Sequence, residues 1–335
     1  MDSTRPYRPA PELQRVLDDI RRLGNPLDQM TRNSVADLWG LREVLAANRL
    51  SRIPVGGVRD VCIPARNRQI PVRMYLPPGR ELARDGRLPA LVYYHGGGWT
   101  LGSIATYDSL CRGLARDSGA LVVSIDYRLA PEHPFPAAVD DAHLALWWVA
   151  RNADDLGADA RRLAVGGDSA GGNLATVVAM RAAKEGLPVA FQLLLYPATD
   201  LTRTDRLSHG HYGRDHLLTT WAIEAFRGFY VPDPRDWRRP EVSPLLAADD
   251  DLRWLPPGLV MTAGCDPLRD EGEAYAHRLA SLGVPVEYQL EPELTHGCLN
   301  LFNGALFPDA ARRVEPVVAA LAAFVGRALE RGCSG

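Results

Sequence analysis

The stretch of sequence that decides the fold is LAVGGDSAGGNLA, residues 163–175. Its apolar start predicts a strand at Leu163–Val165, and the Ala- and Val-rich residues after it predict a helix over 171–184. The glycines between them indicate a tight turn, where Ser169 stands in the pattern Gly-x-Ser-x-Gly. A serine on such a turn adopts a strained conformation and needs small neighbours, so we expect Ser169 to be a nucleophile. A phosphate-binding loop is the alternative, but Asn173 stands where that loop needs a lysine.

Apolar runs alternate with helical segments on both sides of this turn. Further strands are expected at 90–94, 121–125, 191–196, 259–262 and 286–290, and further helices at 107–117, 137–152, 269–282 and 310–329. Continuous apolar strands separated by helices are typical of a mostly parallel sheet that is covered on both faces. Upstream, Val58–Ile63 and Ile70–Leu76 alternate well enough to predict a hairpin. The predicted fold class is therefore α/β, with eight strands flanked by helices.

Two segments fall outside this alternation. The first fifty residues predict two helices, the second starting near Ser34. The stretch 201–255 is much longer than a connection between strands needs, and it predicts one helix around 220–230. We expect residues 1–55 to contribute helices to a cap, and residues 56–335 to form the catalytic domain with the long stretch as a cap insertion.

A second glycine run, His95-Gly96-Gly97-Gly98-Trp99, directly follows the strand expected at 90–94. Acyl transfer creates an oxyanion, which backbone N–H groups stabilise when they already point at it, and bare glycines let the backbone come close. We assign these donors to Gly97, Gly98 and Ala170. A flexible glycine turn is the alternative. His95 itself is expected to shape the loop through hydrogen bonds rather than to act as a base.

An acid and a histidine should follow the serine in that order. Asp266 comes just after the strand expected at 259–262, and His296 just after the one at 286–290. Both therefore emerge at the carboxyl ends of strands, where open α/β sheets hold their sites. Serine is a weak nucleophile alone, so His296 is the expected general base and Asp266 the residue that orients it. Asp270 and Glu271 are rivals for the acid role, but their place in a first helical turn favours interaction with the helix dipole.

Three further histidines, His209, His211 and His216, cluster in the long stretch. A metal site is the alternative, but solvated loop side chains are expected there. No residue is assigned to a metal.

Composition restricts the partners and the compartment. The chain has 335 residues, a formal net charge of −3 and 38 scattered Lys and Arg residues, which argues against a nucleic-acid partner. Its five cysteines include no Cys-x-x-Cys pair, so reduced thiols are expected rather than a zinc site. No apolar run approaches the roughly 18 residues of a membrane span, and the polar, proline-rich start does not resemble a secretory signal. We expect a cytoplasmic protein.

Four pieces of sequence together resemble the hormone-sensitive-lipase-like esterases, the bacterial family IV carboxylesterases of the α/β-hydrolase superfamily. These pieces are YYHGGGW (93–99), DYRLAPEHPFPA (126–137), GDSAGGNLA (167–175) and DPLRDEG (266–272). The resemblance implies a Ser169–Asp266–His296 triad, an oxyanion hole of Gly97, Gly98 and Ala170, and a helical cap. It also implies hydrolysis of short- to medium-acyl esters of small molecules without a cofactor, and a possible homodimer.

One position departs from the family pattern. Family members usually carry a bulky apolar residue after the His-Gly pair, where Cys298 stands here. We expect Trp99, Cys298 and Leu299 to line the substrate pocket, and the departure leaves the shape of the acyl pocket open.

Two kinds of alternative function remain open from the sequence. An acyltransferase, lactonase or amidase acting on a specialised metabolite would use the same fold and triad. A non-catalytic receptor on this fold would lack the catalytic histidine, so His296 argues against it.

Overall fold

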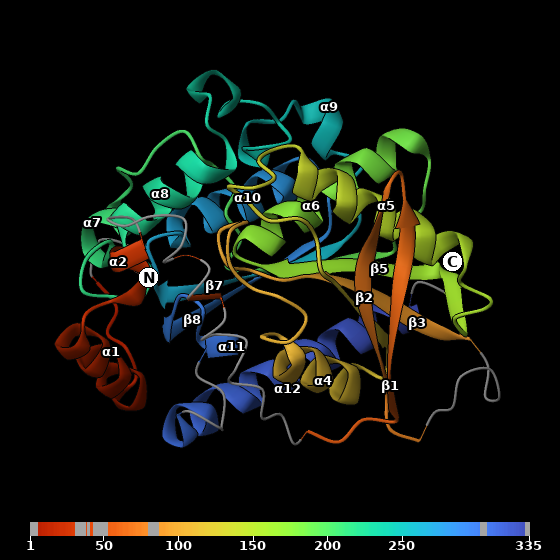
Figure 1. Cartoon of the computed structure of the whole chain (residues 1–335), viewed down its shortest axis with the longest axis horizontal. Helices are drawn as coiled ribbons and strands as arrows, with labels where there is room; N and C mark the ends of the chain where they lie inside the picture. Colours follow the sequence, from red (N-terminus) through yellow and green to blue (C-terminus); the bar gives the residue numbers. More distant parts are fainter. Residues whose placement is uncertain are drawn as a thin grey trace.

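Figure 1 shows the computed structural model, which describes residues 6–30, 38, 41–42, 53–79, 87–301 and 307–331. Its centre is one eight-stranded sheet in the order β1-β2-β4-β3-β5-β6-β7-β8. The strands are β1 (Gly57–Ala65), β2 (Arg68–Leu76), β3 (Leu88–Tyr94), β4 (Leu121–Ile125), β5 (Ala158–Asp168), β6 (Phe191–Leu195), β7 (Gly258–Cys265) and β8 (Val286–Thr295). Strands β3 to β8 run parallel, whereas β2 is antiparallel to both β1 and β4. The predicted α/β fold, its eight strands and its amino-terminal hairpin are confirmed.

Helices cover both faces of the sheet (Figure 1). One face carries α4 (Asp108–Ser118) and α12 (Pro308–Arg331), and the other carries α5 (Ala137–Arg151), α6 (Ala170–Glu185) and α10 (Arg269–Ser281). Strand β3 shows why both faces are needed, since all of its residues are buried. Its alternate side chains separate into two cores. Leu91 and Tyr93 pack in the cluster of α4 and α12, whereas Val92 and Tyr94 pack in the cluster of α5 and α6.

Two strands extend beyond their predicted ends. Strand β5 starts at Ala158 and β8 continues to Thr295, each through polar residues that interrupt the apolar pattern. Strand β8 lies at the edge of the sheet and most of its residues are partly buried or exposed, so its pairing with β7 does not need an apolar sequence. Its extension brings the strand directly up to His296.

The long stretch between β6 and β7 holds more helix than predicted. The expected helix is α8 (Thr220–Tyr230), whose first turn is capped by the Thr219 side chain accepting from the Ala222 N–H. Short segments that the sequence analysis missed accompany it, namely α7 (Leu207–Tyr212), η1 (Pro234–Asp236), η2 (Pro244–Leu246) and α9 (Asp249–Leu252). A further short helix, α11 (Cys298–Leu301), follows β8.

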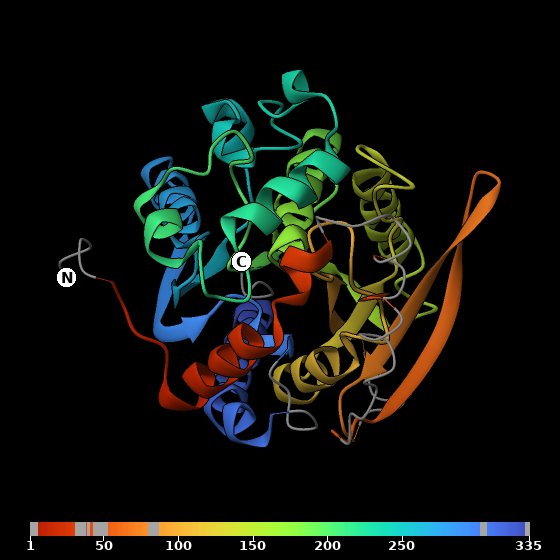
Figure 2. The ribbon, with the colours of Figure 1, turned by 60° about the vertical axis from the view of Figure 1, so that its left-hand side comes forward.

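The amino-terminal helices lie beside this stretch (Figure 2). Helix α1 (Pro11–Leu23) is followed by the short α2 (Pro26–Met30). The Asn25 side chain, between them, donates hydrogen bonds to the carbonyls of His216 at 3.0 Å and Leu217 at 2.9 Å. The helix predicted from Ser34 onward falls almost entirely outside the described residues.

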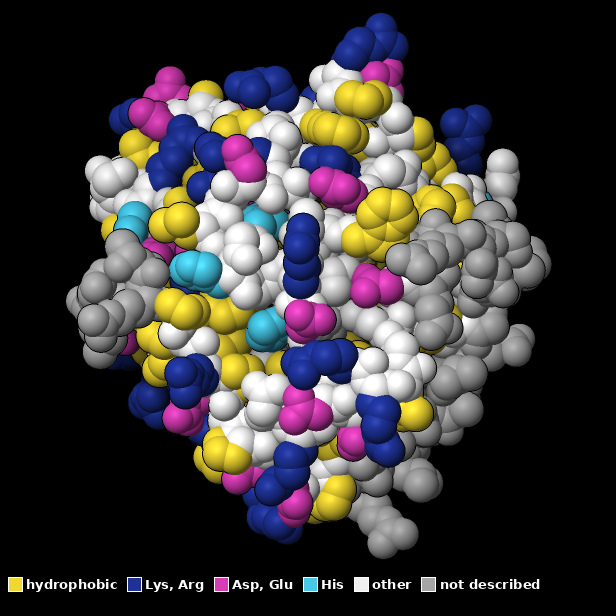
Figure 3. Space-filling view, turned by 90° about the vertical axis from the view of Figure 1, so that its left-hand side faces the viewer, with side chains coloured by type: hydrophobic (Ala, Val, Ile, Leu, Met, Phe, Trp, Pro, Cys, Tyr) yellow, Lys and Arg dark blue, Asp and Glu magenta, His cyan; other side chains and the backbone are white. Residues whose placement is uncertain are grey.

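Figure 3 views the face on which α1 and α7 lie. Basic and acidic side chains alternate over the described part of this face, with apolar atoms between them. This mixed pattern agrees with the small net charge of −3. Among the described residues, none of the helices combines the length and apolar character that a bilayer crossing requires.

Candidate active site

Ser169 stands on a sharp turn between β5 and α6. Its backbone has φ +55° and ψ −119°, a left-handed conformation that side chains other than glycine rarely adopt. The turn closes because Gly171 has no Cβ, which would otherwise overlap the carbonyl oxygen of Tyr94 in β3. This strained turn lifts the Ser169 side chain out of the sheet, as the sequence pattern predicts.

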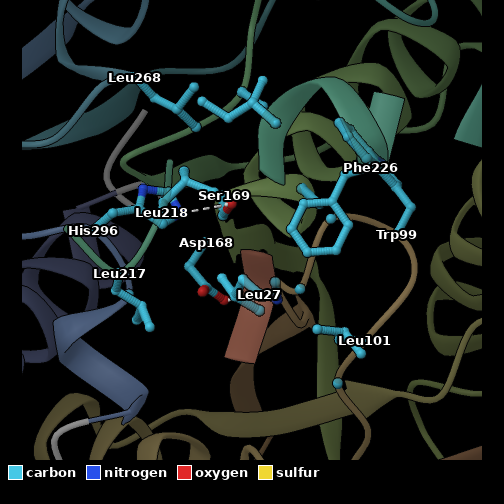
Figure 4. Close-up of a pocket in the computed structure, with 18 of the residues that line it drawn as sticks. Leu27, Trp99, Leu101, Asp168, Ser169, Leu217, Leu218, Phe226, Leu268 and His296 are labelled. Carbon is cyan, nitrogen blue, oxygen red and sulfur yellow. Dashed lines mark hydrogen bonds between the residues drawn. The ribbon is translucent and has the colours of Figure 1, made fainter. Parts of the chain in front are cut away.

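A chain of two hydrogen bonds joins Ser169 to His296 and His296 to Asp266, and Figure 4 shows the first of them. The Ser169 Oγ lies 2.9 Å from the His296 Nε2, and the His296 Nδ1 lies 2.7 Å from the Asp266 Oδ2. An ionised carboxylate can only accept, so the Nδ1–H of His296 donates to Asp266 and Nε2 is left to accept from the serine hydroxyl. This is the arrangement by which an imidazole can take a proton from a serine.

The sheet explains how residues so far apart in sequence meet. Asp266 follows β7 and His296 follows β8, and these strands are parallel neighbours whose carboxyl ends share one edge. Asp266 is fully buried, and its Oδ1 accepts the Leu268 N–H at 2.8 Å. The carboxylate is therefore held on one oxygen by the backbone and on the other by His296.

The rival acids point elsewhere. Asp270 accepts from the Ser208 N–H at 2.8 Å and from Arg269 at 2.8 Å. Glu271 is buried, and it accepts from the N–H groups of Thr199 at 2.7 Å and Asp200 at 3.2 Å. Neither carboxylate bonds to the His296 ring, so both serve local structure.

The glycine run forms a loop beside the serine. Gly97 has φ +112° and Gly98 has φ +60°, and a Cβ at Gly98 would overlap the Phe226 ring. The loop is braced by the Leu101 N–H, which donates to the Gly97 carbonyl at 2.7 Å. The N–H groups of Gly97, Gly98 and Ala170 donate to no other described residue, and all three residues border the cavity at Ser169. They can therefore donate to a bound oxyanion.

His95 takes the structural position that was expected. It is fully buried, its Nδ1 lies 2.8 Å from the Gly96 carbonyl, and its ring stacks on Tyr127 at 4.2 Å. Burial lowers its pKa below the usual value, which keeps the ring neutral.

An apolar cavity of about 310 Å³ opens over Ser169. Figure 4 shows leucines near the His296 side of the serine and aromatic rings on the opposite side. Trp99 lines the cavity, and its ring stacks on Tyr230 at 4.3 Å. The wall also includes residues that the sequence analysis missed, namely Leu27, Leu101, Leu217, Leu218, Phe226 and Leu268. For Leu27, Leu217, Leu218 and Phe226, the only sequence signal was their apolar character within the amino-terminal and 201–255 segments. Leu101 follows the glycine run, and Leu268 lies in the 266–272 piece.

The pocket prediction for Cys298 and Leu299 is wrong. Both are absent from the described cavity wall and lie buried in the core cluster that α4 and α12 share. The physical reason is that α11 begins at Cys298, directly beyond His296 and Gly297, and packs against α12 and α4. Gly297, by contrast, does line the cavity.

The histidine cluster also differs from expectation. His209 is only 5% exposed rather than solvated, whereas His211 and His216 are partly buried. Within the described residues, no group of three or more His, Cys, Asp or Glu side chains is placed to hold a metal ion.

Comparison with known proteins identifies the class. Residues 91–300 match the family described as alpha/beta hydrolase fold, and the chain belongs to it, within the hormone-sensitive-lipase-like esterases that its motifs resemble. Carboxylic ester hydrolase LipN of Mycobacterium tuberculosis is 44% identical over 324 residues, which cover 95% of this chain and 83% of LipN. Ethyl acetate hydrolase of Pseudomonas putida is 40% identical over 267 residues, covering 79% of this chain and 82% of that enzyme.

A solved structure agrees with these relatives. The esterase of Pyrobaculum calidifontis superposes with a TM-score of 0.81 at 40% identity, covering 95% of this chain and 98% of that structure. The chain is therefore a carboxylic ester hydrolase acting on small molecules. The acyltransferase, lactonase, amidase and receptor alternatives are not favoured, because these relatives are named as ester hydrolases.

Proposed function

We propose that Ser169, His296 and Asp266 hydrolyse carboxylic esters through an acyl-enzyme. Ser169 attacks the ester carbonyl while His296 takes its proton and passes it to the leaving alcohol. Water, activated by the same imidazole, then releases the acid. The observation that carries this proposal is the hydrogen-bond chain from the Ser169 Oγ through the His296 ring to Asp266, at 2.9 and 2.7 Å.

The oxyanion of each tetrahedral intermediate would accept hydrogen bonds from the N–H groups of Gly97, Gly98 and Ala170. Two features support this assignment. These amides border the same cavity as Ser169, and they donate to no other described residue. Ala170 is also the first residue of α6, so the positive end of the helix dipole favours the developing negative charge.

Short- to medium-acyl esters are the proposed substrates. A cavity of about 310 Å³ with apolar walls suits small apolar acyl and alcohol groups. A relative named for ethyl acetate hydrolysis supports the short end of this range. A series of p-nitrophenyl esters tests the proposal: kcat/KM should be highest for short or medium chains, and a preference for long chains would contradict it.

We also propose that residues 1–55 and about 201–255 act together as a cap, on a catalytic domain formed by the rest of 56–335. Its support is that Leu27 of α2, Leu217, Leu218 and Phe226 of α8 border the cavity. The hydrogen bond from the Thr219 hydroxyl to Asp28 at 2.5 Å joins the two segments. Removing the amino-terminal helices should therefore alter chain-length preference.

We further propose that the protein forms a homodimer and that it is located in the cytoplasm. Light scattering of the purified chain tests the first, since a monomer mass would contradict it. Fractionation of the native cell tests the second, since recovery outside the cytoplasm would contradict it.

Labelling tests the nucleophile directly. A fluorophosphonate should attach to Ser169, and peptide mass spectrometry would locate it. Attachment to another residue would overturn the assignment of Ser169.

A further inference from the structure

A second buried carboxylate lies next to the serine. Asp168, the residue before Ser169, is 2% exposed and belongs to no part of the hydrogen-bond chain that orients His296. Its Oδ1 accepts the Gly96 N–H at 2.9 Å and the Tyr93 hydroxyl at 2.9 Å. Its Oδ2 accepts the Tyr107 hydroxyl at 2.9 Å. Three donors from three separate segments therefore converge on one side chain.

The free-energy cost of burying this carboxylate shows that the three hydrogen-bond donors are needed to stabilise it. Burial raises the pKa of Asp168 to about 6, and the hydrogen bonds from Tyr107, Tyr93 and Gly96 act in the opposite direction. A carboxylate without such partners would be strongly disfavoured inside the protein. Asp168, Tyr93 and Tyr107 therefore form a buried cluster that is held together by hydrogen bonds.

The position of Gly96 connects this cluster to the oxyanion loop. Gly96 immediately precedes Gly97 and Gly98, whose N–H groups border the cavity. The loop fits closely on the carboxylate, because a Cβ on Gly96 would stand only 2.5 Å from the Asp168 Oδ2 and 2.8 Å from the Tyr107 hydroxyl. Fixing the Gly96 peptide fixes the starting direction of the two peptides that follow it.

Asp168 is also bonded covalently to the nucleophile. One residue thus joins the amides of the oxyanion loop to the turn that carries Ser169. An oxyanion donor is effective only when it lies within a few tenths of an ångström of its required place relative to the nucleophile. The link through Asp168 sets this placement of the loop amides relative to Ser169.

We propose that Asp168 is a positioning residue, which through its hydrogen bonds to Gly96, Tyr93 and Tyr107 sets the oxyanion-loop amides relative to Ser169. The inference rests on the proposed function. It assigns the hydrogen-bonding capacity of Asp168, rather than its negative charge, as the property that matters.

Two substitutions at Asp168 separate these properties. In Asp168→Asn, the amide oxygen can still accept from Gly96 and Tyr93, and the amide nitrogen can donate to the Tyr107 oxygen. In Asp168→Ala all three bonds are lost. We expect Asp168→Ala to lower kcat by roughly 100-fold with little change in KM, since oxyanion stabilisation acts on the transition state. The kcat of Asp168→Asn should be at least tenfold higher than that of Asp168→Ala, because the asparagine keeps the hydrogen bonds that hold the loop. Equal losses in the two variants would overturn the inference.

Tyrosine variants keep the test decisive if Asp168→Ala does not fold. Tyr93→Phe and Tyr107→Phe each remove one donor to Asp168 and should lower kcat, and the double variant should lower it further. The matched control is Tyr94→Phe, because the buried Tyr94 hydroxyl, on the same strand, donates to the Ala142 carbonyl at 3.0 Å instead. Equal kcat values for the double variant and the control would overturn the inference.

Fluorophosphonate labelling separates this inference from the proposed function. If the wild-type enzyme is not labelled at Ser169, the proposed function fails. If Ser169 is labelled but Asp168→Ala keeps the wild-type kcat, only the role of Asp168 fails.

Discussion

The Nδ1 of His296 lies 2.7 Å from the Asp266 Oδ2, and the two residues leave adjacent parallel strands at the same edge of the sheet. Asp266 is fully buried, so this pair is shielded from solvent. A buried acceptor that holds one tautomer of the imidazole leaves the other nitrogen free to take the serine proton.

The first prediction concerns this pair. Asp266→Asn keeps the size of the side chain but can present an N–H to His296, which favours the wrong tautomer. We expect kcat to fall about 10⁴-fold, by analogy with the same change in a serine protease. Steady-state kinetics on p-nitrophenyl acetate checks this. Asp270→Asn, which changes the rival acid, is the control, and a larger loss there would reassign the acid role.

The second prediction concerns the oxyanion loop. Gly98 has φ +60°, and a Cβ there would overlap the Phe226 ring, so Gly98→Ala should displace the loop. Loss of one oxyanion donor costs roughly 100- to 1,000-fold in kcat. Gly79→Ala is a matched control, since Gly79 has φ +73° but open space around its Cβ position. Comparable kcat values for the two variants would contradict the assignment of the loop.

The third prediction concerns the cavity wall. Phe226→Ala removes a ring from the wall, and we expect the optimum of the p-nitrophenyl ester series to move to longer chains. Each additional buried methylene should gain about 0.8 kcal/mol, or about fourfold in kcat/KM. Cys298→Ala is the control, because Cys298 is also buried but is not part of the described cavity wall. A shift of the chain-length optimum in Cys298→Ala would mean that Cys298 does line the substrate pocket.

The fourth prediction concerns pH and stability. Burial raises the pKa of Glu271 to about 8, above its usual value of 4.5. Between these values the folded protein binds more protons than the unfolded chain, so the free energy of unfolding should fall as pH rises from about 4.5 to about 8. Glu271→Gln keeps an oxygen to accept from Thr199 and Asp200 and removes the titration.

Denaturant unfolding at several pH values checks this prediction. The fall in the free energy of unfolding between pH 5 and pH 8 should be smaller in Glu271→Gln than in the wild type, by on the order of 1 kcal/mol or more. An unchanged slope would mean that Glu271 is ionised in the folded protein.

The residues of the proposed triad could be predicted, because a local sequence pattern marks each of them. Ser169 stands on a strand–turn–helix junction, and Asp266 and His296 each follow an expected strand, so the order of elements alone implied that they meet. Residues whose role depends on tertiary position were not predictable. Cys298 was placed in the pocket because it neighbours His296 in sequence, but the start of α11 turns it into the core.

The role of Asp168 was also not predictable from the sequence. Its place in the Gly-x-Ser-x-Gly pattern was visible, but its three donors come from β3, the glycine loop and the start of α4. Only the folded chain brings these segments together. Leu217 and Leu218 are comparable, since nothing in the local sequence indicates that the 201–255 segment directs them to the cavity.

Ser169 is proposed to form the acyl-enzyme, and the Ser169→Ala variant tests this role. The measurement is kcat for p-nitrophenyl acetate in the purified variant, with its thermal melting compared with that of the wild type. We predict a loss on the order of a million-fold in kcat, by analogy with subtilisin, and an intact fold. Near-normal turnover by a folded Ser169→Ala protein would contradict the assignment of Ser169 as the nucleophile.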